Sequence, residues 1–205
     1  MLEPMARKTG SHAEQTGPRV RTAALQLFSK FGYAAVSMRQ IAKEVGVQAG
    51  ALYTYTPDKQ ALLFDLMRAH MLDLLDAYGR VARSNASPHQ RLEDFVRFHI
   101  HYHIDRADEV FISYMELRNL TQDHFEAIEA FRRRYEAALE DILRAGQESG
   151  VFRVSDVRVT SMAIIAMLTG VNTWFRDEGR LSREALADIY WDMVARMISG
   201  VEVPA

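Results

Sequence analysis

Helical spacing of apolar residues runs through most of this chain and constrains its fold more than any other feature. From Arg19 onward, apolar side chains recur every three or four residues, as one buried face of an α-helix requires. No segment alternates apolar and polar residues long enough to form a strand of a sheet. The 205 residues include only 5 prolines and 11 glycines, so long helices can form with few breaks. The pattern predicts an all-α protein of about nine helices.

Local start and stop signals divide these helices. Gly32, Gly46 and Gly150 each follow an apolar helical segment and can end it in the left-handed conformation. Ser37 and Gln40 form a Ser-x-x-Gln capping box that opens the second helix. The expected helices span residues 19–31, 37–45, 48–54, 57–83, 88–105, 108–120, 122–149, 155–178 and 182–199.

The N-terminal part of the chain is basic and the remainder is acidic. Residues 1–60 carry eight lysines and arginines against four acids, whereas residues 61–205 carry 17 basic and 23 acidic residues. A basic block on an acidic body is typical of a protein whose one end contacts phosphate groups. Residues 1–16, which are polar and aperiodic, are expected to be a mobile tail.

Several classes of protein are disfavoured by what the sequence lacks. With no cysteine, disulfides, thiolate nucleophiles and Cys-based zinc sites are excluded. The first twenty residues hold no signal-peptide-like run, and the longest apolar stretch, Met162–Leu168, is far too short to cross a bilayer. We therefore expect a soluble, cytoplasmic protein.

Residues 37–54 have the spacing of a helix-turn-helix. Such a motif needs two short helices that cross steeply, with a turn tight enough to favour glycine, and Gly46 supplies it. Ala42 is small where the helices cross. The shared core is expected to consist of Ile41, Val45, Val47 and Leu52.

The exposed side of this motif can contact DNA in several ways. Gln48 can hydrogen-bond base edges, and Ala49 and Ala51 can meet thymine methyl groups, while Gly50 permits close backbone approach. Farther along the chain, the hydroxyl groups of Tyr53 and Tyr55 and the ammonium group of Lys59 can bind phosphates. The alternative is that the tyrosines are core aromatics and the basic residues ordinary solvated charges. The residues predicted to bind DNA are Ser37, Arg39, Gln48, Ala49, Gly50, Tyr53, Tyr55 and Lys59.

Over residues 20–63 the chain resembles the DNA-binding domain of the TetR family. The shared elements are Phe28-Ser29-Lys30-Phe31-Gly32-Tyr33, Ser37-Met38-Arg39-Gln40-Ile41-Ala42, Gly46-Val47, Leu52-Tyr53-Thr54-Tyr55 and Lys59-Gln60-Ala61-Leu62-Leu63. Thr56, expected to cap the fourth helix with Pro57 after it, departs from the family, which usually has an apolar residue there.

The resemblance implies a transcriptional regulator in two domains. Residues 17–63 would form the helix-turn-helix domain, and residues 64–205 a helical domain that binds a ligand and forms a homodimer. The dimer would bind a palindromic operator, and a small hydrophobic effector would release it, so that the protein acts as a repressor. No cofactor is expected.

The C-terminal half offers weaker motifs. His99 and His103 are four residues apart, a spacing suited to two metal ligands, but no third ligand is evident, and pocket or core-edge histidines are the favoured interpretation. Arg132-Arg133-Arg134 could bind a phosphorylated ligand, but a solvated helix face is favoured. The helices at the C-terminus form the dimer seam in the family. Candidates for that seam here are Met162, Ile165, Trp174, Tyr190, Val194 and Met197.

A narrower resemblance concerns regulators of fatty-acid, acyl-CoA or steroid catabolism. It rests on Asp108-Glu109-Val110-Phe111, Glu116-Leu117-Arg118, Asn172-Thr173-Trp174-Phe175-Arg176 and Gly179-Arg180-Leu181-Ser182. The resemblance implies an acyl-CoA thioester as effector, with a drug-like hydrophobic molecule as the alternative. Arg118 would be a polar group of the pocket or would instead pair near Glu116. The candidate pocket residues are Met71, His99, Tyr102, Met115, Arg118, Met167 and Asn172.

Functions of other classes are less compatible with the sequence. No phosphate-binding loop, dinucleotide-binding glycine motif, nucleophile elbow or zinc-protease motif is present, so an enzyme is not expected. A carboxylate–histidine pair such as Glu116 with His99 remains open. A helical scaffold without DNA binding is disfavoured by the basic N-terminal block and the fixed-spacing motif.

Overall fold

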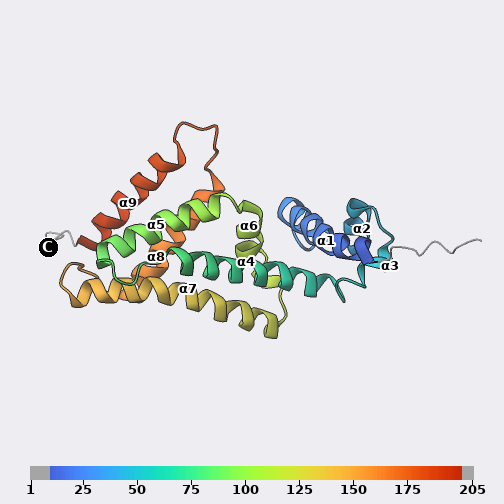
Figure 1. Cartoon of the computed structure of the whole chain (residues 1–205), viewed down its shortest axis with the longest axis horizontal. Coiled ribbons are helices and arrows are strands. Elements are labelled where there is room, and N and C mark those ends of the chain that lie inside the picture. The colour runs from blue at the N-terminus through green and yellow to red at the C-terminus, as the bar shows by residue number, and fades with distance from the viewer. Residues whose placement is uncertain (1–9, 200–205) are drawn as a thin grey trace, which may run out of the picture. The chain divides into compact units, whose positions relative to one another are not determined.

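The described part of the chain, residues 10–199 with side chains from residue 16 onward, is all-α in the computed structural model (Figure 1). It contains nine α-helices and two short 3₁₀ turns, and no strand occurs within these residues. The predicted fold class is confirmed. The helices are α1 Gly10–Phe31, α2 Met38–Val45, α3 Ala49–Leu52, α4 Lys59–Val81, α5 Pro88–Ile104, α6 Ala107–Met115, α7 Gln122–Glu148, α8 Val157–Thr169 and α9 Arg183–Ser199, with 3₁₀ turns at Leu117–Asn119 and Gly170–Thr173.

Contacts divide the chain into two compact units. The N-terminal unit runs up to Arg68 and also includes Phe111–Phe125, whereas the C-terminal unit comprises Ala69–Val110 and the residues from Glu126 onward. The sequence predicted a single boundary after residue 63. It did not predict that Phe111–Phe125 groups with the N-terminal unit, because that segment is distant in sequence from the rest of the unit.

Several predicted helix ends are wrong, each for a local reason. The predicted tail is helical from Gly10. Residues 10–16 extend α1 but have no apolar face, so periodicity did not indicate a helix there. Residues 1–9 lie outside the described residues. Helix α4 is capped by the Asp58 carboxylate, which accepts the Ala61 N–H at 2.7 Å, rather than by Thr56. Helix α8 begins after an Asp156 cap and ends at Thr169, well before residue 178.

Two further helices are shorter than predicted. Helix α3 ends at Leu52 rather than at residue 54, and the chain continues through a turn in which the Tyr55 N–H donates to the Leu52 carbonyl. Helix α6 ends at Met115 and a 3₁₀ turn follows it. The apolar spacing continued past both ends, so periodicity alone did not show where hydrogen bonding changes.

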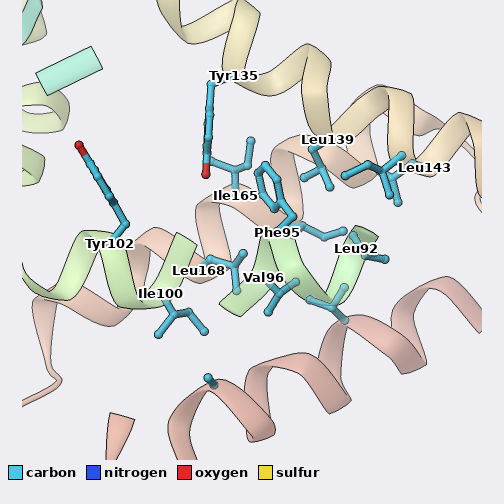
Figure 2. Packing of buried hydrophobic residues seen from close by; sticks show 14 of the residues in the cluster. Leu92, Phe95, Val96, Ile100, Tyr102, Tyr135, Leu139, Leu143, Ile165 and Leu168 are labelled. Atoms are coloured by element: carbon cyan, nitrogen blue, oxygen red, sulfur yellow. The ribbon is translucent and has the colours of Figure 1, made fainter. Parts of the chain in front are cut away.

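The core of the C-terminal unit lies around α5, which packs on α8 and α9. Figure 2 shows apolar side chains of α5, among them Leu92, Phe95 and Val96, gathered with those of α7 and α8. All three are fully buried. Burial of such side chains supplies most of the stability of a helical domain of this size. Among the described residues, no helix is long and apolar enough to cross a membrane.

Candidate nucleic-acid interface and effector site

Helices α2 and α3 are joined by the tight turn that the sequence predicted. Ser37 Oγ accepts the Gln40 N–H at 3.3 Å, and Gln40 Oε1 accepts the Ser37 N–H at 2.7 Å, which confirms the capping box. Gly46 has φ 78°, a left-handed conformation that favours glycine. The Val47 N–H donates to the Ala42 carbonyl at 2.9 Å, so the chain turns immediately after α2. These hydrogen bonds fix where α3 begins.

The inner side of the two helices is buried, which gives α3 a firm support. Ile41 and Leu52 are fully buried, Ala42 and Val45 nearly so, and Val47 is half-buried. The core predicted for this motif is therefore confirmed, apart from the partial exposure of Val47. Because α3 has only four residues, its position depends on this packing rather than on its own hydrogen bonds.

The outer side of the motif presents most of the residues predicted to bind DNA. Ser37, Arg39, Gln48, Gly50 and Tyr53 are exposed, and Tyr53 exposes 57% of its surface. In addition, a side chain at Gly50 would meet nothing within 4 Å, so the protein itself does not require glycine there. Ala49 and Tyr55 are half-buried. The arrangement leaves short side chains and hydrogen-bonding groups facing outward; that they bind DNA stays a prediction.

Lys59 differs from the exposed phosphate anchor that was expected. Its ammonium group donates to the carbonyls of Tyr33 at 2.8 Å and Val36 at 2.7 Å, and it lies 4.1 Å from the centroid of the Tyr33 ring. Burial lowers the pKa of Lys59, and the carboxylate of Glu116 opposes that shift. Lys59 therefore holds the connection between α1 and α2, and its DNA contact remains a prediction for its third N–H.

Replacing Lys59 by methionine is expected to destabilise the N-terminal unit. The change keeps most of the length of the side chain but leaves two carbonyls without their donor, and we expect a loss of about 2 kcal/mol. Lys43→Met, which removes an exposed lysine of α2, is the matched control and should change stability little. Thermal unfolding of both variants measures the difference. If Lys59→Met unfolds like the parent and only weakens DNA binding, Lys59 acts as a phosphate anchor instead.

Glu116 makes a structural contact that the sequence did not predict. Its buried carboxylate accepts the Tyr33 N–H at 3.1 Å and the Asn119 side-chain amide at 2.5 Å. Arg118 is exposed, and its role stays a prediction. With Lys59 on one side and Glu116 on the other, the turn after α1 is fixed by two charged groups. No local sequence signal identifies this contact, since 83 residues separate its partners.

Thr56, the departure from the expected apolar residue, is buried with 3% exposure. Its hydroxyl donates to the Asp58 carbonyl at 2.9 Å, which satisfies the buried polar group. The same stretch supplies the Asp58 cap of α4. Threonine is thus accommodated by a local hydrogen bond that an apolar residue would not make.

The candidate effector residues divide between the two units. Met71, His99 and Tyr102 are buried in the C-terminal unit, where Met167 and Asn172 are half-buried. The other two belong to the N-terminal unit: Met115 exposes 54% of its surface, and Arg118 is exposed as well. The pocket as a whole stays a prediction.

Three buried histidines lie together in the C-terminal unit: His70, His99 and His103. His99 Nδ1 is 3.2 Å from the Tyr135 hydroxyl and its Nε2 is 3.1 Å from the Thr169 hydroxyl. Because both ring nitrogens of His99 have hydroxyl partners, the pair His99 and His103 does not present two free ligands to a metal. Within residues that the structure describes, no group of three or more His, Cys, Asp or Glu is arranged to hold a metal ion.

Exposed apolar residues of α8 and α9 fit only part of the predicted dimer seam. Met162, Trp174 and Met197 are exposed and Tyr190 is half-buried. Ile165 and Val194 belong to the internal core, which leaves little of their surface for a partner, and the seam as a whole stays a prediction. Three further apolar residues of these helices are exposed, Val159, Ile189 and Met193.

Comparisons with known proteins agree with this architecture. A family model described as bacterial regulatory proteins, tetR family, matches residues 20–66, and one described as tetracyclin repressor-like, C-terminal domain, matches residues 85–198. The fatty acid metabolism regulator protein of Bacillus subtilis (strain 168) is 23% identical over 181 residues, or 87% of this chain and 92% of that protein.

Two further relatives are similar over nearly their full length. The HTH-type transcriptional repressor KstR2 of Mycobacterium tuberculosis (strain CDC 1551 / Oshkosh) is 27% identical over 193 residues, covering 93% of this chain and 96% of that protein. A crystal structure of AibR in complex with isovaleryl coenzyme A and operator DNA has a TM-score of 0.80 at 26% identity. The match covers 91% of this chain and 100% of the AibR chain.

Proposed function

Because the chain belongs to the TetR family of bacterial regulatory proteins, we propose that it represses transcription as a homodimer bound to operator DNA. The observation that carries this proposal is the α2–Gly46–α3 motif. Its inner side is buried, and its outer side presents Arg39, Gln48 and Tyr53 to the surroundings. Two copies related by a two-fold axis would place their α3 helices in successive major grooves of a palindrome.

The second copy would pack on exposed apolar residues of α8 and α9. Met162, Met193 and Met197 each expose more than two-fifths of their surface, which is costly in water unless a partner covers them. Methionine adapts well to such contacts. The protein is proposed to act in the cytoplasm, where DNA is accessible, and to have no enzymatic activity of its own.

The effector is proposed to be an acyl-CoA or a related thioester. One relative is named a fatty acid metabolism regulator, and a structural neighbour was crystallised with isovaleryl coenzyme A. A drug-like hydrophobic molecule is the alternative. Binding of the effector would favour a conformation with lower affinity for the operator, since a ligand shifts an equilibrium only by binding one state more tightly.

Titration against salt tests the DNA-binding proposal. Affinity for a fragment from upstream of the protein's own gene is expected to fall about a thousandfold between 50 and 200 mM salt, because binding releases counterions from phosphates. Arg39→Ala should weaken binding about tenfold to a hundredfold at constant stability. Arg133→Ala, which removes an exposed arginine of α7, is the matched control. If Arg39→Ala binds DNA as tightly as the parent, the assignment of Arg39 is contradicted. If binding by the parent does not depend on salt, the DNA-binding proposal itself is contradicted.

A further inference from the structure

Four aromatic side chains form a compact group between α4 and α5 of the C-terminal unit, here called the histidine–tyrosine cluster: His70, His99, Tyr102 and His103. The rings of His99 and His103 stack with centroids 3.8 Å apart. The His70 ring lies 6.0 Å from His103 and 6.2 Å from Tyr102. The cluster adjoins the apolar core, to which Tyr102 and Met71 belong.

Hydrogen bonding fixes the chemical state of half of this cluster. His103 Nδ1 lies 2.8 Å from the His99 carbonyl, which can only accept, so that nitrogen carries the proton. The other ring nitrogen of His103 is then an acceptor. His99 has a hydroxyl partner on each ring nitrogen, Tyr135 on one side and Thr169 on the other. The protein itself therefore supplies the partners of both His99 nitrogens and of His103 Nδ1.

The other half of the cluster is not satisfied. Among the described residues, His70 Nδ1 and Tyr102 Oη have no hydrogen-bond partner although both atoms are buried. The two side chains are 5% and 7% exposed. Figure 2 shows Tyr102 extending from α5 with its hydroxyl at the far end of the ring. Leaving such groups unpaired destabilises a protein, so the arrangement favours a ligand that supplies their partner.

The charges around the cluster indicate what kind of group that ligand presents. Burial lowers the pKa of His70 to about 3 and that of His103 to about 4, so both rings are neutral near pH 7. The guanidinium of Arg106 lies 3.8 Å from the centroid of the Tyr102 ring. Arg80 is also close enough to influence the hydroxyl, as are the acids Asp73 and Glu109. Because two basic and two acidic groups surround the hydroxyl, they provide no net charge to offset that of a carboxylate or an ammonium group, and a buried charge is costly.

We propose that His70 and Tyr102 bind an uncharged oxygen of the effector, as in a thioester carbonyl or an alcohol. The Tyr102 hydroxyl donates to that oxygen, and His70 Nδ1 takes whichever donor or acceptor role the group leaves. The apolar body of the effector lies against Met71 and the neighbouring core. This inference rests on the proposed function, in which a small molecule controls operator binding.

Tyr102→Phe and His70→Leu test the inference without disturbing the DNA-binding helices. The ligands have chains of 4, 8 or 16 carbon atoms, and each chain carries one of four groups: a coenzyme A thioester, an alcohol, a carboxylate or an amine. Calorimetry measures the affinity of the protein for each ligand. A thioester or alcohol should bind best, and each variant should weaken it at least tenfold. Operator affinity without ligand should stay within twofold of the parent.

A contrast within the cluster separates binding from structure. Tyr102→Phe removes an unpaired hydroxyl and should leave the unfolding temperature unchanged or raise it, whereas Tyr135→Phe removes a partner of His99 and should lower it. The inference is overturned if a carboxylate or amine binds best, if no member of the panel binds, or if both variants bind the best ligand normally. If the parent protein does not bind operator DNA, the proposed function is refuted instead.

Discussion

Acidification from pH 7 to pH 5 is expected to lower the free energy of unfolding of the C-terminal unit by about 6 kcal/mol. The cause is the burial of His70, His99 and His103, which are 5%, 1% and 3% exposed. Burial is the largest cause of the lowered pKa of all three, and neighbouring histidines or Arg106 lower it further. In the unfolded chain the same rings would take up protons near their ordinary pKa of about 6.5.

The sign follows from the number of protons that each state binds. Between pH 6.5 and about 4 the unfolded chain is protonated at His70 and His103 and the folded protein is not, and the pKa of His99 is lowered as well, so falling pH favours unfolding. The stability is therefore fully present above pH 6.5 and is lost as the pH falls toward the folded pKa. Each histidine contributes about 1.4 kcal/mol per pH unit below 6.5, or roughly 2 kcal/mol by pH 5.

Urea denaturation at pH 7, 6 and 5 measures the effect. His70→Leu should remove about a third of the pH dependence, because one of the three buried rings is gone. His89→Gln, at an exposed position of α5 outside the three buried rings, is the matched control. If the free energy of unfolding falls by less than about 1 kcal/mol between pH 7 and pH 5, the buried rings do not control acid stability. If His70→Leu loses as much stability over this range as the parent, His70 does not contribute to the effect.

The parts of the fold that sequence predicted are those with a local cause. The Ser37–Gln40 capping box, the left-handed Gly46 and the buried face of α2 each depend on residues within a few positions of one another. The same holds for Gly32 and Gly150, which have φ 80° and 74°. Periodicity and capping chemistry are enough to place such features. The motif that carries the candidate DNA interface belongs to this class.

The parts that sequence missed depend on contacts between distant segments. Glu116 holds the turn after α1 across 83 residues, and Lys59 donates to carbonyls 23 and 26 residues away. His70 and Tyr102 meet because α4 and α5 pack together. Likewise, Phe175 is buried although α8 has already ended, so hydrophobicity alone extended that helix too far. No local pattern distinguishes these residues from ordinary solvated or core positions.

Gly146→Ala is expected to destabilise the C-terminal unit by about 3 kcal/mol, although alanine usually stabilises a helix. Gly146 lies in α7, and a Cβ there would come within 1.9 Å of the Phe152 ring. That ring is 3% exposed and belongs to the core, and the Phe152 N–H donates to the Gly146 carbonyl at 3.0 Å. The ring therefore has little room to move, and overpacking outweighs the gain of up to about 1 kcal/mol in helix propensity.

Gly79→Ala is the matched control, because Gly79 is an exposed residue of α4 and an added Cβ would meet nothing within 4 Å. It should raise the unfolding temperature slightly, whereas Gly146→Ala should lower it by about 6–12 °C. Combining Gly146→Ala with Phe152→Ala distinguishes overpacking from a general defect of α7. If the ring is the obstacle, the double variant loses at least about 2 kcal/mol less than the sum of the single losses. Strict additivity would place the cause elsewhere in the helix.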